Sequence, residues 1–208
     1  MKITRLLTAI VFMSICLAPD IYASTVTATS VMKSCSDKLR AGTPFSVDFV
    51  VSAENGVEIS GDLSVNGRKF AYVTSGAKVI YDGHTQWTVD ELTKEISIYE
   101  PLAAEVEQVN PFLILSGYAA NYNMRLLGGS GNGVARVELV PKNSSDIQKV
   151  IVTINTTSSL PTGFEVYTSD GDVMRIAINN LKLNDNIPAS RFVINTNNYS
   201  DYEVVDLR

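Results

Sequence analysis

The stretch that decides the fold runs from residue 45 to residue 73 and reads FSVDFVVSAENGVEISGDLSVNGRKFAYV. From Phe45 to Val51, apolar side chains alternate with polar or opposite-face positions, and a period of two is typical of β-strands with one buried face. Asn55-Gly56 and Asn66-Gly67 separate the runs, and Asn-Gly favours the positive backbone angles of two-residue hairpin turns. The stretch therefore predicts consecutive antiparallel strands.

The same texture continues through most of the chain. Two further turn signals, Asp82-Gly83 and Asp170-Gly171, stand between alternating runs. Counting the runs predicts about ten to eleven strands in one meander, without a linker or an internal repeat. The fold class is therefore mainly β (α+β).

Two regions follow the period of a helix instead. Residues 27–40 place Val31, Met32 and Cys35 at helical spacing, and residues 100–121 contain helix formers with Pro111 suited to a helix start. A large sheet with a few helices buries their apolar stripes on one of its faces. We therefore expect a single large curved antiparallel sheet, an unclosed β-barrel covered by a few helices, which can hold a ligand between sheet and lid.

The N-terminus is typical of an export signal. Two positive charges precede an apolar run from Leu6 to Ala18, and a small residue, Ala23, ends the segment. We predict a secretory signal peptide over residues 1–23 and a single exported domain over residues 24–208. A buried helix, an uncleaved anchor and a lipid-anchored Cys16 are the alternatives.

Composition and motifs exclude several classes of function. The net charge of −5 and the absence of a basic run argue against nucleic-acid binding. The single histidine, His84, stands in a predicted hairpin turn, Gly128–Gly133 lacks the strand-turn-helix context of a phosphate loop, and Asp170-Gly-Asp172 lacks the spacing of a calcium loop. We therefore predict no enzymatic activity, no metal and no cofactor.

Five segments, taken in order, resemble the periplasmic outer-membrane lipoprotein carrier (LolA) family. They are Gly61–Val65 followed by Arg68 and Phe70, Asp82–Trp87, Asn110–Leu115, Val137–Lys142, and Arg191–Arg208 with its closing Phe strand and acidic-basic tag. The similarity covers nearly all of residues 24–208.

This resemblance implies an unclosed antiparallel barrel with a helical lid over an apolar cavity. It also implies a monomeric periplasmic carrier that takes acylated lipoproteins, or lipid, from an inner-membrane lipoprotein-releasing transporter to an outer-membrane receptor. Exposing an acyl chain to water costs about 0.8 kcal/mol per methylene, so an aqueous compartment can be crossed only in an apolar shelter.

The resemblance also suggests which residues form the site. Residues predicted to line the apolar cavity and lid are Val57, Ile59, Leu63, Val65, Phe70, Tyr72, Trp87, Phe112, Leu113 and Leu115. Arg68 corresponds to a basic latch that bonds lid carbonyls. The family's arginine precedes a proline, whereas Lys69 follows here, so an exposed hairpin arginine is the alternative.

Two other functions stay open from the sequence. An envelope interaction or stress-sensor module on the same fold would bind a protein partner or another lipid, with its interior filled by side chains. A glycan-binding module would use Trp87 and nearby tyrosines.

Overall fold

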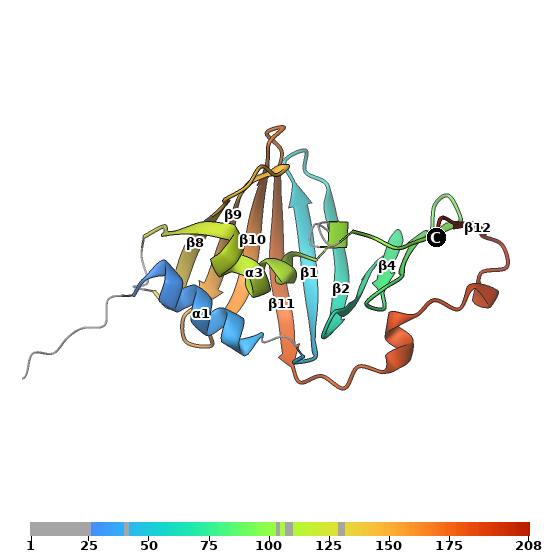
Figure 1. Cartoon of the computed structure of the whole chain (residues 1–208), viewed down its shortest axis with the longest axis horizontal. Helices are drawn as coiled ribbons and strands as arrows, with labels where there is room; N and C mark the ends of the chain where they lie inside the picture. The colour runs from blue at the N-terminus through green and yellow to red at the C-terminus, as the bar shows by residue number, and fades with distance from the viewer. Residues whose placement is uncertain (1–25, 40–41, 103–104, 107–109, 129–131) are drawn as a thin grey trace, which may run out of the picture.

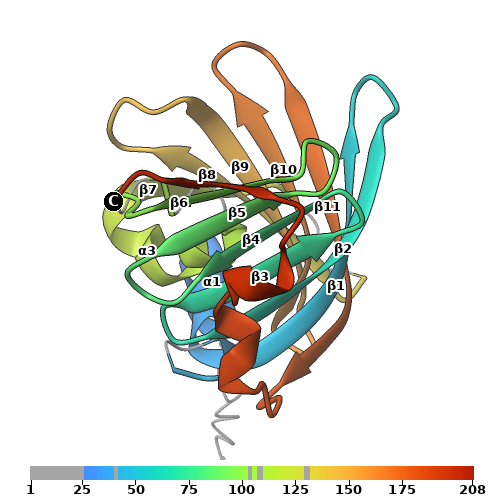
Figure 2. The ribbon, with the colours of Figure 1, turned by 90° about the vertical axis from the view of Figure 1, so that its right-hand side faces the viewer.

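A computed structural model of the chain describes residues 26–39, 42–102, 105–106, 110–128 and 132–208. The predicted signal peptide and Cys16 lie outside these residues. The described strands form one 12-stranded sheet that curves around one face (Figures 1 and 2). The predicted fold class is confirmed, with slightly more strands than the alternation indicated.

Two antiparallel meanders build the sheet. The first contains β1 (Phe45–Ala53), β2 (Glu58–Asn66), β3 (Lys69–Thr74), β4 (Ala77–Tyr81), β5 (Gln86–Asp90) and β6 (Glu95–Tyr99). The second contains β7 (Tyr122–Leu126), β8 (Val134–Pro141), β9 (Ile147–Asn155), β10 (Leu160–Thr168) and β11 (Val173–Leu183). β1 pairs with β11 and joins the meanders, and β12 (Glu203–Asp206) adds to the outer edge of β6 in parallel.

The predicted turns lie between the strands, as expected. Gly56 and Gly67 have φ of 81° and 63°, in the left-handed region that glycine adopts without a steric penalty. Gly83 and Gly171 also have positive φ angles, in the β4–β5 and β10–β11 turns.

Helices lie across one face of the sheet, which we call the concave face (Figure 1). Helix α1 (Ala28–Lys38) begins after Thr27, whose side chain accepts a hydrogen bond from the backbone of Ser30 and caps the first turn. The 3-10 helix η1 (Pro111–Leu113) and helix α3 (Ile114–Asn121) follow the first meander. We call η1 and α3 the lid. Both helical regions confirm the predictions from the sequence.

The segment of residues 184–208, which we call the C-terminal segment, crosses the opposite, convex face (Figure 2). It contains η2 (Ala189–Phe192), η3 (Thr196–Asn198) and β12. Phe192 is 1% exposed and packs against Ala71 and Ile80. The Phe strand expected from the resemblance is therefore wrong, because Phe192 anchors a 3-10 helix and only Glu203–Asp206 forms a strand.

A hydrogen bond from Tyr202 to an ion-paired carboxylate holds the far end of this segment to the sheet. Lys78 Nζ lies 2.6 Å from Glu91 Oε1, and the hydroxyl of Tyr202 donates to the other carboxylate oxygen. Hydrogen bonds from Lys78 and Tyr202 hold the pKa of Glu91 below its usual value.

Candidate functional site

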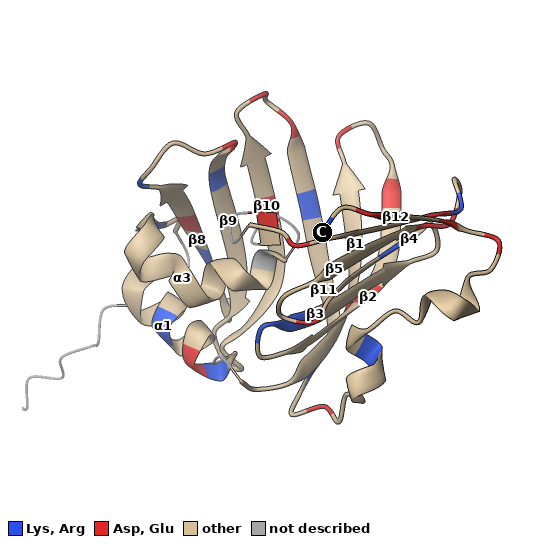
Figure 3. Ribbon diagram, turned by 45° about the vertical axis from the view of Figure 1, so that its right-hand side comes forward, with Lys and Arg blue, Asp and Glu red and all other residues tan. Residues whose placement is uncertain are grey.

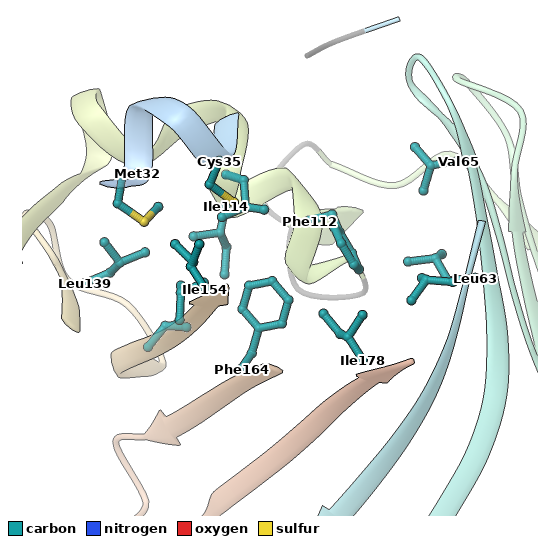
Figure 4. Packing of buried hydrophobic residues seen from close by; sticks show 14 of the residues in the cluster. Met32, Cys35, Leu63, Val65, Phe112, Ile114, Leu139, Ile154, Phe164 and Ile178 are labelled. Carbon is teal, nitrogen blue, oxygen red and sulfur yellow. The ribbon is translucent and has the colours of Figure 1, made fainter. Parts of the chain in front are cut away.

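The concave face is apolar over most of its width. Alternate residues of β1 to β4 and β7 to β11 point to it and form one cluster with side chains of α1 and the lid (Figure 4). Buried strand members of this cluster include Phe45, Val47, Phe49, Leu63, Val65, Phe70, Val137, Leu139, Val152, Ile154, Phe164 and Ile178.

Close approach of strands shapes the floor of this face. The ring of Phe49 stacks on Tyr72 with centroids 4.8 Å apart. Gly61 lies beside Phe49, and a Cβ there would lie 2.3 Å from the Val73 carbonyl oxygen and 2.5 Å from Phe49 Cζ. Burial raises the pKa of the Tyr72 phenol.

The lid places an aromatic wedge over the centre of the concave face. The ring centroid of Phe112 lies 5.0 Å from the ring centroid of Phe45 and 5.5 Å from that of Phe164. Figure 4 shows Phe112 above Phe164. The buried side chain of Asn110 accepts a hydrogen bond from the Phe112 amide and fixes the start of η1. Leu115 is 2% exposed behind it. Lid side chains therefore fill the centre of this face.

One margin of the concave face is uncovered. We call Val57, Ile59 and Met174 the rim; their exposed fractions are 51%, 44% and 37%. Ile59 pairs with Val51, a concave-face residue of β1, and Met174 pairs with Ala53, so the rim continues this face. The tips of β1, β2 and β11 extend past the lid in Figure 1. Apolar surface therefore reaches solvent beside the lid.

Acidic residues accompany the rim. Figure 3 shows them at the β1–β2 and β10–β11 tips, where the sequence has Glu54, Glu58, Asp170 and Asp172. These carboxylates disfavour the approach of an anionic headgroup to the strand tips.

Most of the predicted lining residues gather at this face. Leu63, Val65, Phe70 and Tyr72 lie on its floor, Phe112, Leu113 and Leu115 belong to the lid, and Val57 and Ile59 to the rim. Whether they bind a ligand stays a prediction.

Trp87 is the exception, because it lies on the convex face. Tyr81 pairs with Gln86, whereas Ile80 pairs with Trp87, so Trp87 points away from the lid. It packs beside Ile80 and Phe192 under the C-terminal segment. Its predicted place in the cavity is therefore corrected.

Arg68 lies in the β2–β3 turn and is exposed. Its latch role stays a prediction. A different basic residue, which the sequence reasoning did not select, bonds lid carbonyls here. Lys142 Nζ, just after β8, donates to the carbonyl oxygens of Ala119 and Ala120 at 3.0 and 2.9 Å. The sequence feature that could have pointed to Lys142 is the Pro141-Lys142 pair at the end of β8.

The residues considered for other chemistry lie in turns. His84 is exposed in the β4–β5 turn, with Nε2 3.0 Å from Glu100 Oε1. The glycine cluster falls between β7 and β8, and its residues 129–131 lie outside the described part. Among the described residues, no group of His, Cys, Asp and Glu could hold a metal ion, and no helix is long and apolar enough to span a membrane.

A curved sheet with a lidded apolar face is the architecture of a binding or carrier fold. Residues 25–170 match the model of a family described as outer membrane lipoprotein carrier protein LolA. The chain belongs to this family, which confirms the resemblance found in the sequence.

Several solved structures are similar to this chain at low sequence identity. An uncharacterized conserved protein from Thermus thermophilus is 14% identical, with a TM-score of 0.58 over 86% of this chain and 98% of that one. A putative outer membrane lipoprotein-sorting protein domain from Vibrio parahaemolyticus is 12% identical, with a TM-score of 0.45 over 83% of this chain and 99% of that one. A chain of the Pseudomonas aeruginosa MucA/MucB complex is 16% identical, with a TM-score of 0.49 over 81% of this chain and 61% of that chain. No curated protein sequence matches this chain.

Proposed function

We propose that this protein is a non-enzymatic periplasmic carrier that binds acylated lipoproteins, or lipid, against its concave face. It receives them from an inner-membrane transporter and delivers them to an outer-membrane receptor. The observation that carries this proposal is an apolar face that continues from beneath the lid to a solvent-exposed rim at Val57, Ile59 and Met174.

The closed lid suits a carrier that must release its cargo. Each buried methylene of an acyl chain contributes about 0.8 kcal/mol, so a long chain would bind very tightly to an empty apolar cavity. Here an entering chain must first displace Phe112, which packs between Phe45 and Phe164. That displacement offsets part of the gain and leaves an affinity from which delivery can run downhill.

Soluble complex formation with a purified acylated lipoprotein tests this proposal. The chain from residue 24 onward is incubated with the lipoprotein, and the complex is measured by native mass spectrometry. Ile59→Glu places a charge on the rim and should abolish the complex. Ser60→Glu is the matched control, because Ser60 is the next residue on β2, is exposed, and points to the opposite face. Equal binding by both variants would contradict the placement of the site.

A protein-binding envelope module is the second candidate. It is favoured by the filled centre of the concave face, where the side chains of Phe112 and Leu115 are buried against the sheet. A mass that stays unchanged after incubation with lipoprotein, and again with phospholipid, would support this function against the carrier.

A further inference from the structure

The side chains of the concave face change from apolar to polar at its β5–β6 end. Direct pairing places Phe70, Tyr81, Gln86 and Tyr99 in one row across four strands. The first two belong to the apolar cluster beneath the lid, whereas the last two are polar. The neighbouring row repeats the change, passing from Val79 to Thr88 and Ser97. An apolar surface therefore ends in a polar one on the same face.

Gln86 is the buried member of this polar end. It is 2% exposed, and its Nε2 donates to the hydroxyl of Tyr99 and, at 3.4 Å, to Thr88 Oγ1. Its Oε1 is also buried and has no hydrogen-bond partner among the residues that the structure describes. Buried polar atoms in folded proteins almost always have a partner, and leaving one unpaired is costly. This carbonyl oxygen is therefore an acceptor that is held in place by its own amide group and is not used by the described part of the chain.

We infer that Gln86 Oε1 accepts a hydrogen bond from the N–H of an amide that joins an acyl chain to the cargo; this inference rests on the proposed function. The chain would lie along the apolar row at Phe70 and Tyr81, with its linkage at Gln86. An amide linkage offers the required donor, whereas an ester linkage offers only acceptors. Gln86 therefore determines specificity for amide-linked over ester-linked acyl chains.

Two carboxylates lie farther along the same face, two rows beyond Gln86. Asp90 and Glu95 face each other in the row beyond Thr88, on the same side of the sheet. Two carboxylates disfavour a phosphate or free carboxylate nearby. An amide N–H carries no net charge and fits both the acceptor and its surroundings.

Paired probes test this assignment. The same dye is linked to a lauroyl chain through an amide or through an ester, and both affinities are measured by fluorescence titration of the chain from residue 24 onward. The wild type should bind the amide probe about 3- to 10-fold more tightly, the effect of one net hydrogen bond. Gln86→Met, of similar shape but without the carbonyl, should bind both probes equally and keep the affinity for the ester.

Tyr99→Phe provides a second variant, because it removes the hydroxyl that orients the Gln86 amide. It should reduce the preference while the ester affinity stays the same. Equal affinities in the wild type, or a preference that survives in Gln86→Met, would overturn the role of Gln86 and leave the carrier function standing. Failure of the wild type to bind either probe would overturn the carrier function itself, and this inference with it.

Discussion

Replacing Phe112 by alanine should change stability and ligand affinity in opposite directions. Phe112 is 8% exposed and contacts Phe45 and Phe164, so its truncation removes the centre of the closed lid. Phe→Ala substitutions in cores cost about 3–5 kcal/mol. Urea unfolding of Phe112→Ala should therefore show a loss of about 3 kcal/mol in the free energy of unfolding.

The same substitution should strengthen binding. If the ligand displaces Phe112, the closed state competes with binding, and the observed affinity is reduced by the population of that state. Burial of a phenylalanine side chain contributes about 1.5–3 kcal/mol, which corresponds to about 10- to 150-fold in affinity. Titration with an acyl probe should show tighter binding within this range.

Phe192→Ala is the matched control. Phe192 is the same residue type at 1% exposure, but it lies under the C-terminal segment on the convex face. The Phe192→Ala variant should lose about as much free energy of unfolding as Phe112→Ala and should bind the acyl probe with the wild-type affinity. If Phe112→Ala binds no more tightly than Phe192→Ala, the lid ring is not displaced by the ligand, and the reasoning fails.

Four further predictions follow from local contacts. Gly61→Ala should lose about 1–3 kcal/mol in urea unfolding because its Cβ would meet backbone and Phe49, whereas Gly76→Ala, with open space around it, should stay within about 1 kcal/mol of wild type; equal effects would contradict the close approach. Burial raises the pKa of the Cys35 thiol to about 12. Ellman's reagent at about pH 8 should therefore label Cys35 only after the protein unfolds. Rapid labelling of Cys35 in the native protein would disprove this packing. Because the pKa of Glu91 is lower in the folded protein, its carboxylate stabilises the fold above about pH 4.5, and this stabilisation is lost as the pH falls through the folded pKa. The free energy of unfolding should therefore differ less between about pH 7 and about pH 3 in Glu91→Gln than in the wild type. Lys142→Met should lower stability by at most about 1 kcal/mol through loss of its bonds to the end of α3, and Lys142→Arg should restore it; an unchanged midpoint for Lys142→Met would show that these bonds contribute nothing.

The local features of the fold were predictable from sequence because they depend on neighbouring residues. Asn66-Gly67 determines its turn through the backbone freedom of Gly67, and Thr27 and Pro111 mark helix starts through capping and fixed φ. The floor of the site followed from strand alternation at Leu63 and Val65.

Features that depend on distant residues were not predictable. The pairing of β1 with β11 joins residues far apart in sequence, and no local pattern specifies it. A shift of one residue in strand register moves a side chain to the other face, and this is why Trp87 was placed in the cavity although Gln86 lies there. The C-terminal segment has no regular period, and its path over the convex face depends on contacts with distant residues, such as those of Phe192 and the pairing of β12 with β6.

The connection between α3 and β7 constrains how the lid can move. Asn121 ends the helix and Tyr122 begins the strand, with no residue between them, and Lys142 bonds the last turn at that point. The C-terminal end of the lid is therefore tied directly to the sheet. Helix α3 has eight residues, so its far end stands about 12 Å from Asn121. If the lid opens by turning about its C-terminal end, Phe112, at the other end, moves farthest and leaves the centre of the sheet first.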